Sequence, residues 1–324
     1  MQTRLTEVLG IEHPVMLAGM GGVSYHRLVA AVSEAGGLGC LGASTMSILE
    51  MVEEIRRVRE LTGKPFGVDL LTAMPGDMSQ QVEKIVEGGA SVFVAGLGVP
   101  TDVVDLCHRH GLVVINMCGK VDHARRSVDA GCDIVVAQGT EAGGHTGLVA
   151  TFPLVPQIVD AVGDQVPVVA AGGITDGRGL AAALALGADG VWVGTRFIAT
   201  PEARAVAGFK EALLDTAEDG TTISRAYSGK TMRVVRNAYT AYFDEHPDEL
   251  QRFPAQLGRS IGDKAFHLGG DAKTTEVDPS MECYPAGQGV GAVRGLVPAG
   301  ELVLRFVTEA EAAVARVTSA IVRA

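Results

Sequence analysis

A strand-and-helix unit recurs through the first 204 residues, and this repetition constrains the fold more than any other feature of the sequence. Short apolar runs rich in β-branched residues begin near Val15, Leu38, Phe66, Val92, Leu112, Ile134, Val166 and Val191. Amphipathic helical stretches lie between them, most clearly at 47–61, 78–87, 101–109, 121–130, 154–162 and 177–186. Apolar strands that alternate with helices predict a parallel sheet that is covered on both faces.

Eight such strands suffice to close a (β/α)8 TIM barrel, whose usual size is about 200 to 250 residues. Glycines just past the helical stretches, as in 34–39, 129–133 and 186–190, are typical of chains that turn back into a sheet. The alternative is an open doubly wound sheet. However, the first strand-to-helix turn, 18–23, lacks the full G-x-G-x-x-G pattern, and no acidic residue ends the second strand. We therefore predict an α/β barrel over residues 1–204.

After Arg204 the strand-and-helix period disappears. Residues 205–217 predict a helix, and 218–300 contain five prolines and a glycine cluster at 287–291. We expect residues 205–300 to form a mostly helical cap and substrate region over one barrel mouth. Residues 301–324 end the chain, and 301–322 show one apolar helical face, which predicts a helix packed back on the barrel.

Charge and cysteine content exclude several classes of protein. With 27 Lys plus Arg against 38 Asp plus Glu, the net charge of −11 argues against nucleic-acid and anionic-membrane partners. No run approaches the roughly 20 apolar residues of a membrane helix, and the first ten residues do not resemble a signal peptide. Five scattered cysteines without a Cys-x-x-Cys pair predict reduced thiols and no zinc site. We expect a cytoplasmic protein.

A glycine-rich loop with one histidine follows the sixth strand. The apolar run 134–137 opens into a loop that contains Gly139, Gly143, Gly144, His145 and Gly147. Glycines allow another molecule to approach the backbone closely, and histidine titrates near neutral pH. This loop is therefore a candidate wall of a cofactor site. The alternative is a flexible surface loop with an incidental histidine.

The seventh and eighth strands each end in a glycine turn. Gly172-Gly173 precedes a helix-capping segment, 175–177, and Gly194-Thr195-Arg196 ends the eighth strand. Backbone N–H groups at such turns are suited to binding phosphate, although tight turns without a ligand would have the same sequence. Arg196 either adds positive charge to this site or points outward to solvent.

Six ordered segments resemble the nitronate monooxygenase (2-nitropropane dioxygenase) family of FMN-dependent barrels. These segments are 14–20, 35–39, 64–68, 138–147, 170–174 and 194–197. The similarity as a whole runs from about Arg4 to Phe197. The family also contains FMN-dependent enoyl-acyl-carrier-protein reductases. Residues 221–224 and the Gly-Gln-Gly segment are more similar to that branch.

The resemblance implies a set of site residues. FMN would be bound by Ala18, Gly19, Met20, Asp69, Gln138, Gly143, Gly172, Gly173, Trp192, Gly194 and Thr195. In this scheme the two glycine turns hold the phosphate, and Gly19 and Met20 lie along the flavin ring. His145 has the position of the family's catalytic histidine.

Two positions differ from the family pattern. Asp69 stands where the family usually has Asn, and Trp192 where it often has Gln. An ionised Asp69 beside an electron-rich reduced flavin would oppose reduction unless the carboxyl is protonated or paired. Trp192 would replace an amide with a large ring.

The resemblance implies oxidation of alkyl nitronates or nitroalkanes with O2 to carbonyl compounds and nitrite. His145 suits removal of an α-proton or a hydrogen bond to a nitronate, while the cofactor carries the redox chemistry. An NAD(P)H-dependent enoyl-thioester or quinone reductase would use the same histidine. Flavin-free sugar-phosphate lyases or isomerases and non-catalytic flavin-storage proteins are alternatives of other classes. The partner expected is a small molecule, and the oligomeric state stays open, a homodimer included.

Other candidate residues have simpler interpretations. His108 and His110 are two apart, so they do not share a helix face and predict no metal site. Cys118 has no basic neighbour in the sequence, and an ordinary apolar cysteine is expected. Tyr227, Tyr239 and Tyr242 predict packing in the cap region, and the acidic residues of 244–249 a solvated face.

Overall fold

Eight parallel strands form a closed barrel in the computed structural model, which describes residues 1–72, 78–96, 98 and 100–322. The strands are β1 (Val15–Leu17), β2 (Gly39–Gly42), β3 (Phe66–Leu71), β4 (Val92–Gly96), β5 (Val113–Cys118), β6 (Ile134–Gln138), β8 (Val168–Ala171) and β9 (Gly190–Val193). Their spatial order is β1-β9-β8-β6-β5-β4-β3-β2. Hydrogen bonds from Leu17 N to Leu38 O (2.9 Å) and from Leu38 N to Val15 O (3.0 Å) join the two ends. The predicted (β/α)8 barrel is confirmed.

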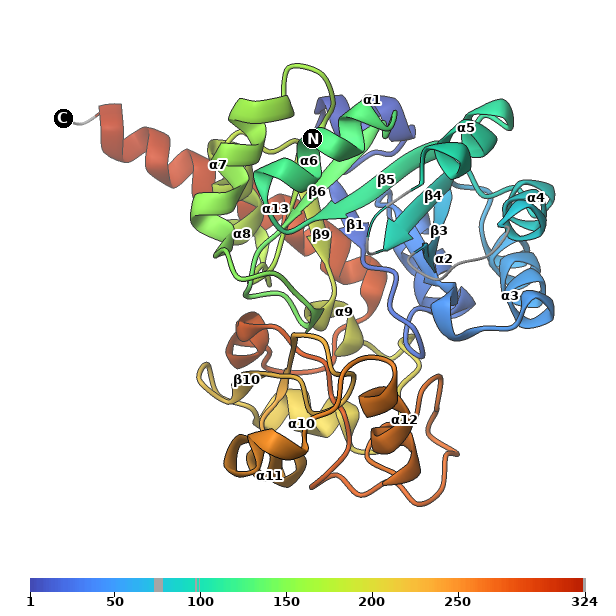
Figure 1. The fold of residues 1–324 in the computed structure, drawn as a ribbon. Coiled ribbons are helices and arrows are strands. Elements are labelled where there is room, and N and C mark those ends of the chain that lie inside the picture. The colour runs from blue at the N-terminus through green and yellow to red at the C-terminus, as the bar shows by residue number, and fades with distance from the viewer. Residues whose placement is uncertain (73–77, 97, 99, 323–324) are drawn as a thin grey trace.

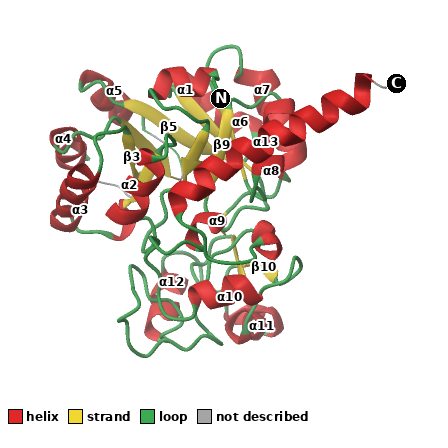
Figure 2. Cartoon of the chain, turned by 180° about the vertical axis from the view of Figure 1, so that it is seen from behind, coloured by secondary structure: helices red, strands yellow, loops and turns green. Residues whose placement is uncertain are grey.

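Helices surround these strands (Figures 1 and 2). They are α2 (His26–Glu34), α3 (Ile48–Leu61), α4 (Ser79–Glu87), α5 (Thr101–Arg109), α6 (Val121–Asp129), α7 (Thr151–Val162) and α8 (Gly177–Ala185), with a short turn, η1 (Ala43–Thr45), after β2. The long helix α13 (Ala299–Val322) packs against α8, which precedes β9, and against α2, which follows β1. Its C-terminal end projects beyond the body of the molecule (Figure 1).

The helix-to-strand joints use the glycines that the sequence placed there. Gly36, Gly89, Gly131 and Gly187 have φ angles of +84°, +79°, +95° and +92°, a region that residues with a side chain rarely adopt. Each glycine lies one to three residues after a helix end, so the chain reverses there into the next strand.

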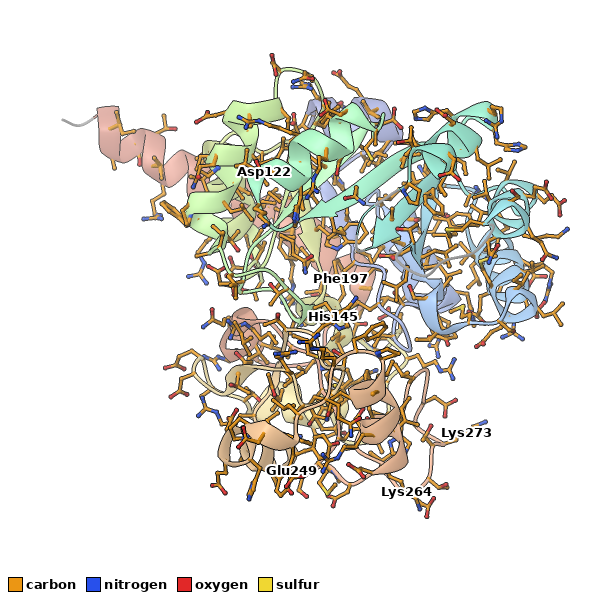
Figure 3. The ribbon with its side chains drawn as sticks, viewed as in Figure 1. Asp122, His145, Phe197, Glu249, Lys264 and Lys273 are labelled. Carbon is orange, nitrogen blue, oxygen red and sulfur yellow. The ribbon has the colours of Figure 1, made fainter. Side chains whose placement is uncertain are left out.

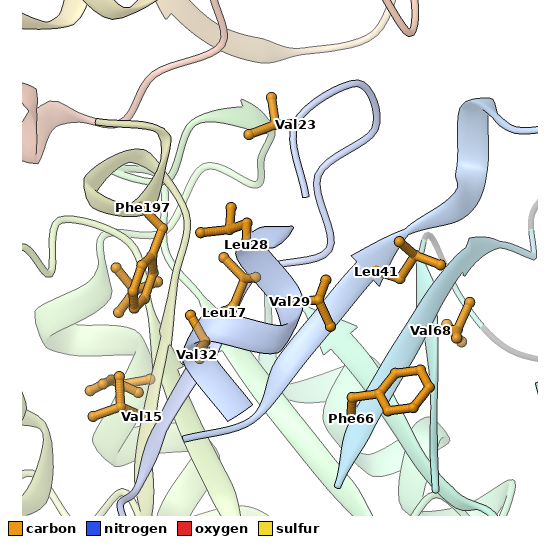
Figure 4. Packing of buried hydrophobic residues seen from close by; sticks show 14 of the residues in the cluster. Val15, Leu17, Val23, Leu28, Val29, Val32, Leu41, Phe66, Val68 and Phe197 are labelled. Atoms are coloured by element: carbon orange, nitrogen blue, oxygen red, sulfur yellow. The ribbon is translucent and has the colours of Figure 1, made fainter. Parts of the chain in front are cut away.

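Two apolar layers lie on the two faces of the barrel wall. Outward-facing strand residues such as Val15 and Leu17 pack under the helices, where they meet residues such as Val29 of α2 (Figure 4). Inward-facing residues fill the barrel with another cluster, which includes Met16, Ile115 and Trp192. A short helix that the sequence analysis did not predict, α1 (Arg4–Leu9), places Leu5 and Leu9 in this inner cluster. Each buried leucine contributes about 2 to 3 kcal/mol by transfer from water.

The cap lies over one barrel mouth, and α1 lies at the opposite one (Figure 1). Its elements are α9 (Thr195–Ile198), α10 (Phe209–Asp215), β10 (Thr221–Ser224), β11 (Met232–Val235), α11 (Ala238–Glu245), η2 (Pro247–Glu249), α12 (Ala255–Gly262) and η3 (Gln288–Ala292). An antiparallel sheet that was not predicted, β10-β11-β7, joins the cap to the barrel loop through β7 (Gly144–His145). The helix predicted over 205–217 begins only at Phe209, because Gly208 precedes it at a φ of +80°. Within the described residues no helix is both long and apolar enough to span a membrane.

Candidate functional site

His145 lies where the barrel meets the cap (Figure 3). It belongs to β7, in the loop after β6, and stands opposite Met232 of β11. Its Nε2 atom lies 2.9 Å from the Oγ atom of Ser228, in the turn between β10 and β11. The cap therefore holds the imidazole in place by both backbone pairing and a side-chain contact.

The surroundings of His145 keep its ring neutral. Burial lowers the pKa of His145 below its usual 6.5, and the positive charge of Lys230 lowers it further. A neutral imidazole at pH 7 can accept a proton, which is the property that the sequence analysis required of this residue.

The hydroxyl of Ser228 has two possible acceptors. Its Oγ atom lies 2.9 Å from His145 Nε2 and 3.3 Å from the carbonyl oxygen of Lys230. Ser228 either donates to Nε2, or accepts from the Nε2–H group and donates to that carbonyl oxygen. The Nδ1 atom has no hydrogen-bond partner among the described residues.

A cavity of about 790 Å³ opens beside His145. It is lined by Gly98, Asn116, Met117, Gly119, His123, Arg126, Ser127, Gln138, His145, Thr146, Gly147, Arg225, Gly229, Lys230 and Thr231. Of the predicted site residues, Gln138 and His145 line this cavity. They are also linked, since Gln138 Nε2 donates a hydrogen bond of 3.0 Å to the carbonyl oxygen of His145.

Positive charge lines the same cavity. Arg126 and Arg225 bond backbone carbonyl oxygens of Asp122 and Gly229, at 3.2 and 3.0 Å. Lys230 Nζ stacks 4.3 Å from the centroid of the Phe253 ring. None of these three cations forms an ion pair with a carboxylate of the described residues. The cavity is therefore suited to a negatively charged substrate.

The two predicted glycine turns lie side by side. In the pairing of β8 with β9, Ala171 stands opposite Trp192, so Gly172-Gly173 and Gly194-Thr195 follow from neighbouring strands. Gly172 and Gly173 have φ angles of +105° and +73°, which only glycine adopts easily.

The backbone amides at these turns are free donors. No acceptor among the described residues takes a hydrogen bond from the N–H groups of Gly172, Gly173, Gly194 or Thr195. The side-chain hydroxyl of Thr195 accepts a hydrogen bond of 2.9 Å from Gly287 N, and this bond attaches the cap to the turn. Unpaired amides on adjacent turns fit a phosphate group.

The remaining predicted residues lie around the barrel mouth. A Cβ atom on Gly194 would stand 3.4 Å from Met20 Sδ and 3.5 Å from Ala18 Cβ, so the ends of β1 and β9 are in contact there. Trp192 points into the barrel with the inner cluster. Gly143 packs against the cap, because a Cβ on it would lie 2.7 Å from Gly287 N.

Asp69 lies on the inner face of β3 and is 8% exposed. Burial raises its pKa to about 8, and its carboxyl group has no hydrogen-bond partner among the described residues. It packs closely on Gly19, where an added Cβ would lie 2.2 Å from the Asp69 Cβ atom. A carboxyl group that is protonated at pH 7 removes the objection that an ionised Asp69 would oppose flavin reduction.

Sequence reasoning missed Ser228, Lys230 and Arg225. They come from the turn between β10 and β11, and that turn reaches His145 only through long-range strand pairing. The available signal was the polar turn Ser228-Gly229-Lys230 between two β-branched runs, 221–224 and 232–235, which indicates a hairpin.

The structure places the secondary candidates as follows. His108 bonds Asp133 (3.0 Å), Cys118 is buried, and burial raises its pKa to about 11. The described residues contain no cluster of metal-binding side chains. Tyr242 is 41% exposed, unlike the buried Tyr227 and Tyr239. Arg196 points neither to solvent nor to the glycine turns, since it is buried and bonds carbonyl oxygens at 3.3 and 3.4 Å.

Substitution of Lys230 by Gln is expected to raise the pKa of His145, because it removes the second cause of the depression while burial remains. The acid limb of kcat/KM should move to higher pH. The matched control is Lys273→Gln, whose charge lies on the outer edge of the cap (Figure 3). A profile of the Lys230 variant that coincides with the profile of the control would contradict the assignment.

Comparison with known proteins identifies the family. A model described as nitronate monooxygenase matches residues 2–80 and 71–309. A Mycobacterium tuberculosis protein, (3aS,4S,5R,7aS)-5-hydroxy-7a-methyl-1-oxo-octahydro-1H-indene-4-carboxyl-CoA dehydrogenase, is 43% identical over 73% of this chain, and the chain covers 66% of that relative's length. The structure of FabK from Thermotoga maritima is 33% identical with a TM-score of 0.88, covering 98% of this chain and 99% of that one. Nitroalkane oxidase from Streptomyces ansochromogenes is 31% identical with a TM-score of 0.85, over 97% and 99%. The chain therefore belongs to the nitronate monooxygenase family of oxidoreductases.

Proposed function

We propose that the protein is an FMN-dependent nitronate monooxygenase, which oxidises alkyl nitronates and nitroalkanes with O2 to carbonyl compounds and nitrite. The observation that carries this proposal is the neutral imidazole of His145 on the wall of a cationic cavity. Membership of the family and the similarity to a nitroalkane oxidase support the same activity.

The residues around the barrel mouth fit FMN. The free amides of Gly172, Gly173, Gly194 and Thr195 would hold its phosphate. Ala18, Gly19, Met20, Asp69, Gln138, Gly143 and Trp192 would surround the rest of the cofactor. When bound, FMN supplies the electron transfer between the substrate and oxygen.

The protein groups bind the substrate and move its proton. The unpaired cations of the cavity, Arg126, Arg225 and Lys230, attract an anionic nitronate. A neutral nitroalkane first loses its α-proton to His145 Nδ1, in the tautomer whose Nε2–H group donates to Ser228. The resulting imidazolium faces the anionic nitronate. Its attraction to that opposite charge lowers the free-energy cost of forming a positive charge in this site.

A thioester oxidoreductase is the second candidate, and the size of the cavity favours it. A cavity of about 790 Å³ exceeds the needs of a small nitronate and leaves room for a larger acyl substrate. The relative at 43% identity is named as a dehydrogenase of a carboxyl-CoA compound. In this alternative His145 polarises or protonates an enoyl thioester, and NAD(P)H is the reductant. A quinone reductase would use the same reductant.

Anaerobic mixing with the purified protein separates these functions. A yellow protein with flavin absorption is expected, and ethylnitronate should bleach that absorption within seconds while NADH does not. Rapid bleaching by NADH or NADPH followed by reoxidation with crotonyl-CoA or a quinone would replace the oxygenase assignment with the reductase one. A colourless protein that does not take up added FMN would overturn both and favour a flavin-free barrel enzyme.

A further inference from the structure

A second cavity lies on the outside of the barrel and is lined by residues of α13 and of the N-terminal end of α8. These two helices lie next to each other in Figure 2. Its volume is about 670 Å³. The charged residues on its wall are Asp176, Arg178, Arg196, Arg294, Arg305, Glu309 and Arg316. We propose that this cavity binds the phosphate groups of a nucleotide or of an inorganic polyphosphate, at a site separate from the proposed flavin site.

Arg196 is the buried centre of this site. Its side chain is 8% exposed, and Nη1 donates weak hydrogen bonds to Ala199 O (3.3 Å) and Gly295 O (3.4 Å). Its Nε and Nη2 groups have no acceptor among the described residues, and no carboxylate of those residues forms an ion pair with it. A buried guanidinium without a counter-ion is costly, so an anion in the cavity would stabilise it.

Two further arginines on the wall are unpaired. Arg294 and Arg316 are exposed, and neither guanidinium group forms a hydrogen bond or ion pair within the described part of the chain. By contrast, Arg178 pairs with Asp176, and Arg305 pairs with Glu301. Three guanidinium groups thus remain available to one ligand, in a protein whose net charge is −11.

The two acidic residues of the wall already have partners in α8. Asp176 caps this helix by accepting from Arg178 N (2.9 Å) and Gly179 N (3.4 Å). Glu309 Oε2 accepts from Gly177 N at 3.0 Å. These carboxylates are therefore directed at the helix N-terminus and do not pair with Arg196. Burial lowers the pKa of Arg196, the charge of Arg305 lowers it further, and the charge of Glu309 partly offsets this.

The chemistry of the wall selects phosphate as the ligand group. Guanidinium groups bind phosphate with paired, charge-assisted hydrogen bonds, and arginine is preferred over lysine at such sites. A volume of about 670 Å³ exceeds the needs of a single phosphate and suits a nucleotide or polyphosphate.

The cavity is distinct from the glycine turns. None of Gly172, Gly173, Gly194 and Thr195 lines it. The segment η3 packs on the Gly173 turn, since a Cβ on Gly289 would lie 2.4 Å from Thr175 Cγ2 and 3.2 Å from Gly173 O. The proposed flavin phosphate therefore binds at the glycine turns, and the arginine cavity is a separate site next to them.

The test is calorimetric titration of the flavin-loaded protein with ADP and with inorganic pyrophosphate, at low salt. The double variant Arg294→Gln/Arg316→Gln should raise the Kd of the tighter probe about a hundredfold, roughly tenfold for each lost charge-assisted contact. Flavin content and turnover should not change. Arg236→Gln is the matched control, because Arg236 is also exposed and unpaired among the described residues but lies in the cap.

The two probes distinguish the source of the phosphate. ADP that binds at least tenfold more tightly than pyrophosphate supports a nucleotide, and equal affinities support an inorganic polyphosphate at the same site. Arg196→Lys, with its thermal unfolding checked, should also weaken binding because lysine cannot form the paired contact. The proposal is overturned if neither probe binds, if the double variant binds as tightly as the wild type, or if Arg236→Gln weakens binding equally.

Discussion

Replacement of His145 by Asn is expected to lower kcat/KM for a neutral nitroalkane by about 10²- to 10⁴-fold, the usual contribution of a general base. FMN content should remain near the wild-type value, since the imidazole is not among the groups proposed to hold the cofactor. With a pre-ionised nitronate the loss should be much smaller, because that substrate has already lost its α-proton. The measurement is steady-state oxygen consumption with both substrate forms.

His123→Asn is the matched control for this experiment. His123 lines the same cavity and burial also lowers its pKa, but it comes from α6, outside the strand pairing that positions His145. Its replacement should leave the ratio of nitroalkane to nitronate turnover unchanged. Equal losses in both variants, or an unchanged rate in the His145 variant, would remove His145 from the proposed mechanism and favour a flavin-storage protein.

The barrel could be predicted from the sequence because its determinants are local. Each strand is a short, mostly apolar run, and the observed strands begin within two residues of the positions expected from those runs. Helix bounds were also close, as in 101–109, because amphipathic period and caps define them. The helix α1 was missed because it has only six residues, too few for a period to show.

The geometry around His145 could not be predicted in the same way. The two-residue strand β7 exists only because Met232, 87 positions later in the chain, pairs with His145. Ser228 reaches the imidazole through that pairing, and no local pattern encodes such a contact. The glycine turns were easier, because a glycine pair at a strand end has few structural roles.

Charge states depend on surroundings that a sequence does not display. Asp69 lies within β3 and Arg196 in α9, just after β9, and the sequence left open the charge state of Asp69 and the direction of Arg196. In the structure both are buried without a counter-ion among the described residues. Burial favours the neutral form of an aspartic acid, whereas arginine keeps its charge and requires an anion. Burial therefore leaves Asp69 neutral, whereas Arg196 stays charged and requires an anion.

Asp69→Asn is expected to stabilise the flavin-free protein by roughly 4 kcal/mol at pH 7, because it removes the cost of keeping a buried carboxyl protonated. The folded protein keeps the proton on Asp69 up to about pH 8, whereas the unfolded chain releases it near pH 3.8. Folding at pH 7 therefore takes up a proton at this site, and the amide of Asn needs none. The measurement is urea unfolding of both proteins.

The pH dependence gives the sharper form of this prediction. The contribution of Asp69 to stability is complete below pH 3.8, falls by about 1.4 kcal/mol per pH unit as the pH rises, and levels off above about pH 8. The difference in unfolding free energy between Asp69→Asn and wild type should therefore grow between pH 5 and pH 8 with that slope. Asp244→Asn, which removes an exposed carboxylate of α11, should give a nearly constant difference. A difference for Asp69→Asn that is also independent of pH would mean that Asp69 is ionised in the folded protein, and a carboxylate beside Gly19 would then oppose the reduction of any flavin bound there.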